Sequence, residues 1–138
     1  MNKNPSETKY CAINIQYPMS QLILSGKKTI ETRKYPIPEQ YIGKELLIIE
    51  TPGKNGKFKA RIVGKVIFGA SFEYEAKKAF YEDQKRHCVT KDSIWAWKSD
   101  SAKFGWPVEK IELFPSPLPA PVKKGIKFTK NVTLPQLE

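Results

Sequence analysis

Histidine and cysteine are scarce in this chain, whose 138 residues include one histidine and two cysteines. Metal sites and catalytic sets built on Ser-His or Cys-His pairs need several such side chains at defined spacings, and His87 has no partner at ligand spacing. We therefore expect no metal and no cofactor, and we interpret His87 as a cation at a helix end. Cys11 and Cys88 have no metal-ligand spacing either, so free thiols in a reducing cytoplasm are expected.

Long apolar runs are also absent, which excludes a membrane-spanning helix. The first nine residues are polar and have no apolar stretch of the signal-peptide type. A chain of this length suffices for one domain with a substantial core. We expect a flexible N-terminal tail over residues 1–9, one domain over residues 10–130 and a C-terminal tail over residues 131–138.

Acidic residues are few relative to basic ones, because 24 Lys and Arg stand against 14 Asp and Glu and give a formal net charge of +10. Such a surface attracts polyanions, although a basic excess also serves solubility alone. Residues 57–68 alternate between apolar and polar positions, and one parity carries Lys57, Lys59, Arg61 and Lys65. This pattern predicts a long strand whose basic outer face either binds phosphates or protects an open sheet edge.

The remaining segments indicate short strands combined with two helices. Helices are predicted from Pro18 to Gly26 and over residues 71–87, the second by its apolar spacing and its i, i+4 charge pairs. Alternating or buried apolar runs predict further strands at residues 10–16, 29–33, 45–50, 93–98, 105–114 and 123–128. The fold class expected is α+β, a small mixed β-barrel of about five to six strands with two main helices.

The segment Leu22–Lys34 concentrates three local signals: a helix ends, the chain turns and a strand begins. Gly26 suits the left-handed residue that ends a helix, and the β-branched residues after it favour a strand. Five ionisable side chains gather around this turn, namely Lys27, Lys28, Glu31, Arg33 and Lys34. They could form a solvated ion-pair network, bind an anion, or include a lysine that a carboxylate positions for proton transfer.

The run Leu24–Arg33 resembles the signature of the ASCH domain family, whose motif reads roughly Gly-Lys-Lys-Thr-Ile-Glu-x-Arg. Later segments are similar to family landmarks in the same order, so the resemblance covers about residues 10 to 130; these segments are 41–49, 62–66, 95–97 and 117–125. The resemblance implies a PUA-like β-barrel and a cytoplasmic domain that binds RNA or single-stranded nucleic acid. Some relatives in this family are enzymes.

We therefore expect a protein that binds single-stranded RNA or DNA, or a modified base, in a cleft around the turn. Phosphates would meet basic side chains, and a base would stack on an aromatic ring while Lys28 and Glu31 read its edge. The phosphate contacts expected are Lys27, Arg33, Lys59 and Arg61, and the stacking candidates are Tyr17, Trp97 and Trp106. A monomer or weak dimer without membrane contact is expected.

Two alternatives remain open. The resemblance allows a hydrolase that acts on RNA or on N4-acylated cytidine, with Lys28 as base and Glu31 as the second catalytic residue. In the amidohydrolase relatives a threonine nucleophile follows the motif lysine three positions later, whereas this chain has Glu31 there. The other alternative is a protein-interaction module that uses the proline-rich segment Phe114–Val122, which lacks a clear PxxP register.

Overall fold

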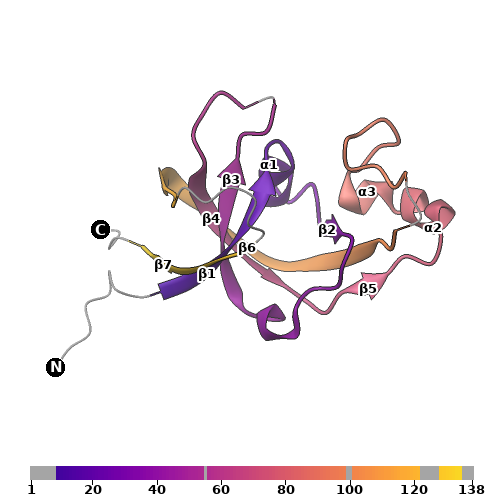
Figure 1. Ribbon diagram of the computed structural model, residues 1–138, viewed down its shortest axis with the longest axis horizontal. Coiled ribbons are helices and arrows are strands. Elements are labelled where there is room, and N and C mark those ends of the chain that lie inside the picture. Colours follow the sequence, from indigo (N-terminus) through magenta and orange to yellow (C-terminus); the bar gives the residue numbers. More distant parts are fainter. Residues whose placement is uncertain (1–8, 55, 99–100, 122–127, 135–138) are drawn as a thin grey trace. The chain divides into compact units, whose positions relative to one another are not determined.

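The computed structural model describes residues 9–54, 56–98, 101–121 and 128–134. Within these ranges the chain forms seven strands, three short α-helices and one 3-10 helix, which confirms the α+β class (Figure 1). In chain order the elements are β1 (Lys9–Gln16), α1 (Met19–Leu24), β2 (Ile30–Arg33), η2 (Glu39–Tyr41), β3 (Glu45–Thr51), β4 (Arg61–Phe68), β5 (Phe72–Glu73), α2 (Lys77–Glu82), α3 (Gln84–His87), β6 (Phe104–Pro119) and β7 (Phe128–Thr133).

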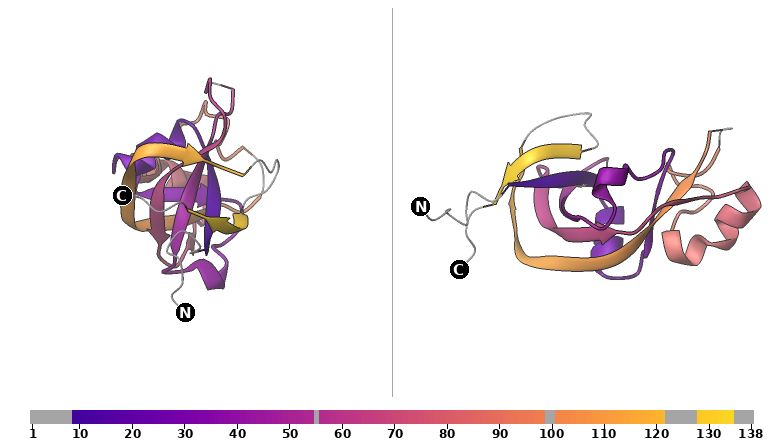
Figure 2. Two further views of the ribbon diagram at one scale, coloured as in Figure 1. Left: turned by 90° about the vertical axis from the view of Figure 1, so that its left-hand side faces the viewer. Right: turned by 90° about the horizontal axis from the view of Figure 1, so that it is seen from below.

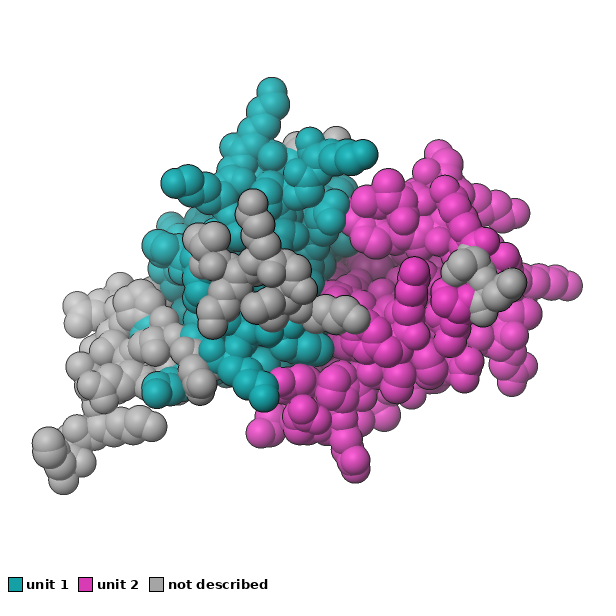
Figure 3. All heavy atoms as spheres, in the orientation of Figure 1, with its two compact units in different colours: residues 1–20, 45–66, 112–138 teal, residues 21–44, 67–111 magenta. Residues whose placement is uncertain are grey.

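The chain divides into two compact units that interleave along the sequence (Figure 3). Unit 1 comprises residues 1–20, 45–66 and 112–138, and unit 2 comprises residues 21–44 and 67–111. Strands β4 and β6 contribute residues to both units. Among the described residues, no helix is long and apolar enough to cross a membrane. Strand β1 begins at Lys9, and strand β7 ends at Thr133.

Unit 1 is organised by strand β1, which pairs in parallel with β3 and antiparallel with β7. Strand β7 (yellow) accordingly lies beside β1 (indigo) in both views of Figure 2. As predicted from its unbroken apolar run, Leu46–Ile49 of β3 is buried on both faces. One hydrophobic cluster joins these strands, and its buried members are Ala12, Leu47, Ile49, Ile62, Phe114, Val132 and Leu134.

Strand β6 is sixteen residues long and continues through the proline-rich segment, with Pro115, Pro117 and Pro119 at alternate positions. In unit 2 this strand pairs antiparallel with both β2 and β5, and Gly105 is opposite Thr32 on one side and Phe72 on the other. A Cβ atom on Gly105 would lie 2.6 Å from Cζ of the Phe72 ring, so glycine makes room for this aromatic side chain.

The predicted helix over residues 71–87 is wrong in its first third, and the observed helical part is interrupted near its end. Phe72 and Glu73 form strand β5, because pairing with β6 satisfies their backbone groups and packs the Phe72 ring. Helices α2 and α3 then follow, separated at Asp83, whose backbone leaves the helical region. The aromatic core of unit 2 forms around Phe80, which stacks on His87 with ring centroids 4.0 Å apart.

Two further strand predictions need correction. The basic strand begins at Arg61 and not at Lys57. Ile62, Val66 and Phe68 of its predicted inner face are buried, but Val63 of the predicted outer face is buried as well. Residues 93–98 form turns and bends instead of a strand, because backbone groups there bond to nearby side chains, including Trp97 N–H to the Tyr81 hydroxyl. The predicted strand at residues 123–128 lies almost entirely outside the described residues; β7 begins at its last position, Phe128.

Candidate functional site

The turn after helix α1 places two neighbouring lysines in different surroundings. Gly26 has the predicted left-handed backbone, with φ +82°, and the N–H of Lys28 donates to the carbonyl of Leu22 at 2.9 Å. Glycine adopts this conformation without steric cost, so the chain reverses sharply here. As a result, Lys27 is exposed, whereas Lys28 points into unit 2 and is only 1% exposed.

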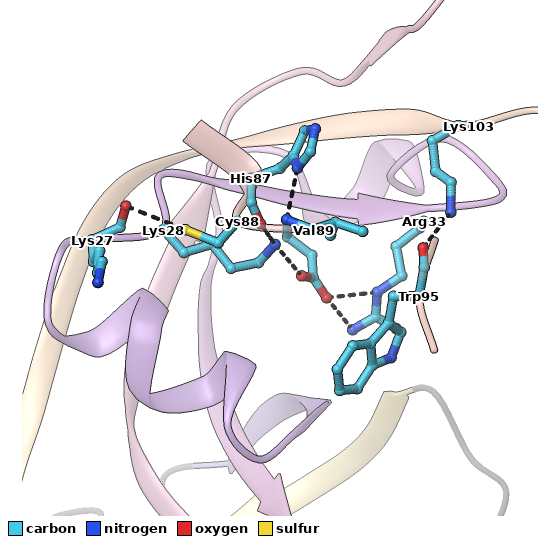
Figure 4. Close-up of polar contacts among 9 residues, drawn as sticks. Lys27, Lys28, Arg33, His87, Cys88, Val89, Trp95 and Lys103 are labelled. Carbon is cyan, nitrogen blue, oxygen red and sulfur yellow. Dashed lines mark hydrogen bonds and ion pairs between the residues drawn. The ribbon is translucent and has the colours of Figure 1, made fainter. Parts of the chain in front are cut away.

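The ammonium group of Lys28 is held by unit 2 from two sides. It donates a hydrogen bond to the backbone carbonyl of His87, and its Nζ lies 3.7 Å from Oε1 of Glu31 (Figure 4). A backbone hydrogen bond from Thr29 N–H to the carbonyl of Arg86 also connects the turn to helix α3. Burial lowers the pKa of Lys28 below its ordinary value, and the carboxylate of Glu31 only partly opposes this effect.

Glu31 and Arg33 lie two residues apart on β2 and form a close ion pair. Oε2 of Glu31 accepts hydrogen bonds from Nε of Arg33 at 2.9 Å and from Nη2 of Arg33 at 2.8 Å. Burial alone would raise the pKa of Glu31, but the charges of Arg33 and Lys28 outweigh it and leave this pKa below its ordinary value. Glu31 is therefore a buried carboxylate that keeps its charge.

Arg33 is further positioned by two aromatic residues. Its Nη1 lies 3.4 Å from the hydroxyl of Tyr35, and its guanidinium lies 5.6 Å from the centroid of the Trp106 ring. The indole N–H of Trp106 donates to the carbonyl of Tyr35 at 3.1 Å. Because Trp106 is 0% exposed, it cannot stack on a base, and its expected role in binding is corrected to that of a core residue.

Lys103 is a member of this cluster that the sequence did not reveal. It is 5% exposed, and its Nζ donates to the carbonyl of Trp95 at 3.3 Å (Figure 4). Burial lowers its pKa, and the positive charges of Lys34 and Lys28 lower it further. The pairing of β2 with β6 places Arg33 opposite Phe104, so Lys103 lies just beyond the end of β2. This pairing is not visible in the sequence alone.

His87 is not the helix-terminal cation that the sequence indicated. It ends α3, but it is 0% exposed, and burial lowers the pKa of its imidazole. The next residue, Cys88, adopts a left-handed backbone with φ 62°, and its Sγ lies 3.7 Å from the carbonyl oxygen of Lys27. His87 and Cys88 thus hold the turn in place from the side of α3.

Trp97 is half-buried in unit 2, and its indole N–H donates to the carbonyl of Ser101 at 2.7 Å. Its ring meets the edge of Phe80 at a centroid distance of 5.7 Å. Trp97 therefore packs on the aromatic core while the residue as a whole remains partly exposed. It is the one predicted stacking residue in unit 2 that keeps exposed surface.

The other predicted binding residues, Tyr17, Lys59 and Arg61, belong to unit 1. Arg61 donates through Nε to Oε1 of the fully buried Glu50 at 2.9 Å, and its guanidinium lies 4.0 Å from the centroid of the Phe58 ring. Tyr17 meets Phe58 edge to face at 5.7 Å. Lys59 is exposed. Unit 1 thus has its own group of an arginine and two aromatic rings beside an exposed lysine.

Known structures share this fold. A crystal structure of ASCH from Zymomonas mobilis matches with a TM-score of 0.63 at 14% identity, covering 87% of this chain and 85% of the other. A serine-to-alanine mutant of the same protein matches with a TM-score of 0.61 at 14% identity, covering 90% of this chain and 89% of the other. A tyrosine-to-phenylalanine mutant matches with a TM-score of 0.63 at 15% identity, covering 89% of this chain and 90% of the other.

The sequence matches no family profile, and no curated protein matches it. At these identities the likeness shows the fold alone. This chain therefore has an α+β fold like that of these ASCH structures, as the sequence resemblance implied.

Proposed function

We propose that the protein binds single-stranded nucleic acid, with RNA favoured over DNA, or a modified base within such a strand. The observation that carries this proposal is the buried set of Lys28, Glu31 and Arg33 at the turn in unit 2. Burying charged groups is costly, and replacing such a set with apolar side chains often stabilises a protein. Ionisable groups in such surroundings are concentrated at functional sites.

The charge of the chain supports a polyanionic partner. Lys27 and Lys34 are exposed on either side of the buried set, and the whole chain has a formal charge of +10. In this proposal Lys27 and Arg33 contact phosphates from unit 2, and Lys59 and Arg61 contact them from unit 1. The protein acts in the cytoplasm as a monomer or weak dimer.

Base recognition in this proposal uses two aromatic residues and the carboxylate of Glu31. Trp97 in unit 2 and Tyr17 in unit 1 are partly exposed residues, and their rings are assigned to stacking. Oε2 of Glu31 is bound by Arg33, and Oε1 lies 3.7 Å from Nζ of Lys28. The carboxylate is assigned to an exocyclic amino group of the base, while the Lys28 ammonium fixes the carboxylate.

A hydrolase that acts on RNA or N4-acylated cytidine is the second candidate, and the lowered pKa of Lys28 favours it. A buried lysine amine can serve as a base near neutral pH once it has lost its proton. The carboxylate of Glu31 counts against this candidate, because it occupies the motif position of a threonine nucleophile and is bound by Arg33. The protein-interaction module is less favoured, since β6 takes up residues 114–119 of its proposed segment.

Binding isotherms for single-stranded and double-stranded RNA and DNA of one length, at several salt concentrations, test the proposal. We expect single strands to bind more tightly than duplexes, and affinity to fall steeply with salt because lysines displace condensed counterions. Lys27→Ala should weaken binding to all sequences, whereas Lys44→Ala, at another exposed position of unit 2, should not. Equally weak binding to all four polymers with a shallow salt dependence would reject the proposal.

The contribution of unit 1 needs a separate variant. Lys59→Ala should lower affinity for every oligonucleotide about equally and flatten the salt dependence, with Lys130→Ala as the matched exposed control. Arg61 is unsuitable for this test, because its removal leaves the buried carboxylate of Glu50 without its cation. Unchanged binding by Lys59→Ala would place the phosphate contacts elsewhere.

A further inference from the structure

Lys103 carries a buried ammonium group that has no carboxylate partner within the part of the chain that the structure describes. Its Nζ makes one hydrogen bond there, to the carbonyl of Trp95 at 3.3 Å, and lies 5.5 Å from the centroid of the Phe80 ring. An ammonium group has three donors and a full charge to compensate. One neutral acceptor and one aromatic face offset only part of the cost of burying the charge of Lys103, which is 5% exposed.

The surroundings of Lys103 are already positive. Two other cationic side chains, Lys28 and Arg33, share the single carboxylate of Glu31, and Arg33 takes both hydrogen bonds to one of its oxygens. The Lys28 and Lys34 charges act unfavourably on Lys103, and Glu31 only partly offsets them. In Figure 4 the Lys103 side chain reaches the carbonyl of Trp95, and the dashed lines from Arg33 end on the carboxylate that it binds. Among the described residues, the cluster therefore holds more positive than negative charge.

We propose that this cluster is an anion site, and that it takes a phosphate group of the nucleic acid ligand with Lys103 as the donor. An anion supplies the missing negative charge and the missing acceptors at once. An ammonium group suits a phosphate, because it brings a full charge and three donors to the phosphate oxygens. The inference rests on the proposed function and adds a ligand class to it: a nucleotide, and not a nucleoside or free base.

The unmodified protein provides the first test. Calorimetric titrations at matched ionic strength compare cytidine 5′-monophosphate, cytidine and inorganic phosphate. We expect the monophosphate to bind at least about tenfold more tightly than cytidine, the effect of one hydrogen bond to a charged group. We also expect inorganic phosphate to bind more weakly than the mononucleotide and to compete with it. Equal affinity for cytidine and its monophosphate overturns the site, and inorganic phosphate that binds as tightly as the mononucleotide overturns its assignment to a nucleotide.

Substitution of Lys103 provides the second test. Lys103→Met keeps the length of the side chain and removes an incompletely compensated charge, so we expect an equal or higher melting temperature. The same variant should lose the preference for the monophosphate over cytidine. Lys44→Met, at an exposed position of unit 2, should keep both the wild-type melting temperature and the preference. A clearly lower melting temperature for Lys103→Met, or a retained preference, would show that Lys103 is a structural residue.

The two proposals fail in different ways. If single strands bind as expected but Lys103→Met keeps the phosphate preference, the anion site is wrong and the nucleic-acid function stands. If mononucleotides bind through their phosphate but single strands have no advantage over duplexes, the anion site stands and the proposed function is wrong.

Discussion

The backbone N–H of Val89 donates a hydrogen bond of 2.9 Å to Nδ1 of His87, so this ring nitrogen is an acceptor. The other ring nitrogen, Nε2, lies 2.6 Å from the carbonyl oxygen of Phe80 and must be a donor. The two contacts select the neutral imidazole with its proton on Nε2. A proton added to Nδ1 would face the N–H of Val89, which agrees with the lowered pKa that burial gives His87.

This tautomer predicts that stability depends on pH just below neutrality. Because the folded-state pKa of His87 is lowered, only the unfolded state takes up a proton as the pH falls below about 6.5. The free energy of unfolding should therefore decrease from pH 7.5 to pH 5.5, and urea unfolding at several pH values measures it. His87 is the only histidine, so His87→Gln should flatten this dependence. The same slope in both proteins would contradict the prediction.

Removing the carboxylate of Glu31 should destabilise the fold. Glu31→Ala leaves the buried ammonium of Lys28 with only the carbonyl of His87, and losing one partner of a buried ion pair costs about 3 kcal/mol. Arg33 is less buried and can turn toward water, which limits the loss. Urea denaturation with the exposed Glu82→Ala as control measures the effect. A loss as small as that of the control would mean that the ion pairs contribute little to folding.

Of the three tryptophans of unit 2, Trp97 and Trp106 should respond differently to substitution. Trp106→Ala removes a fully buried ring and should cost about 3 kcal/mol or more, seen as a strongly lowered or lost cooperative melt. Trp97→Ala should retain a cooperative melt and weaken binding of single strands, because base stacking contributes about 1 to 3 kcal/mol per base. If Trp97→Ala binds as tightly as the wild type, the Trp97 ring belongs to the core alone.

We predict no hydrolysis of N4-acetylcytidine, or a very slow one. The position of a threonine nucleophile is taken by Glu31, whose attack on an amide would form a reactive anhydride, and Arg33 already binds this carboxylate. Release of cytidine from N4-acetylcytidine, followed by chromatography, tests the prediction. Multiple turnovers that Lys28→Ala abolishes and Lys44→Ala preserves would instead identify an amidohydrolase.

Local sequence signals were enough to predict those elements whose structure depends mainly on neighbouring residues. Gly26 ends helix α1 with the expected left-handed backbone, and the apolar run Leu46–Ile49 is a strand buried on both faces. The ionisable cluster at the turn was found because its members are neighbours in sequence. Lys28 and Glu31 are nevertheless more deeply buried than a solvated network allows.

The features that the sequence did not predict depend on contacts between segments that are far apart in the chain. Phe72 was expected in a helix because its spacing fits one, but its pairing with Gly105 of β6 overrides that local preference. His87 looked like an exposed helix end, and only the stacking of its ring on Phe80 reveals its burial. Lys103 becomes part of the site through the register between β2 and β6, which no single segment specifies.

The alternate prolines of β6 have a consequence for association between chains. Successive residues of a strand direct their N–H groups to opposite edges, so Pro115, Pro117 and Pro119 all remove donors from the same edge. An edge without donors cannot template the addition of a strand from another molecule. This segment of β6 should therefore resist intermolecular sheet extension along that edge.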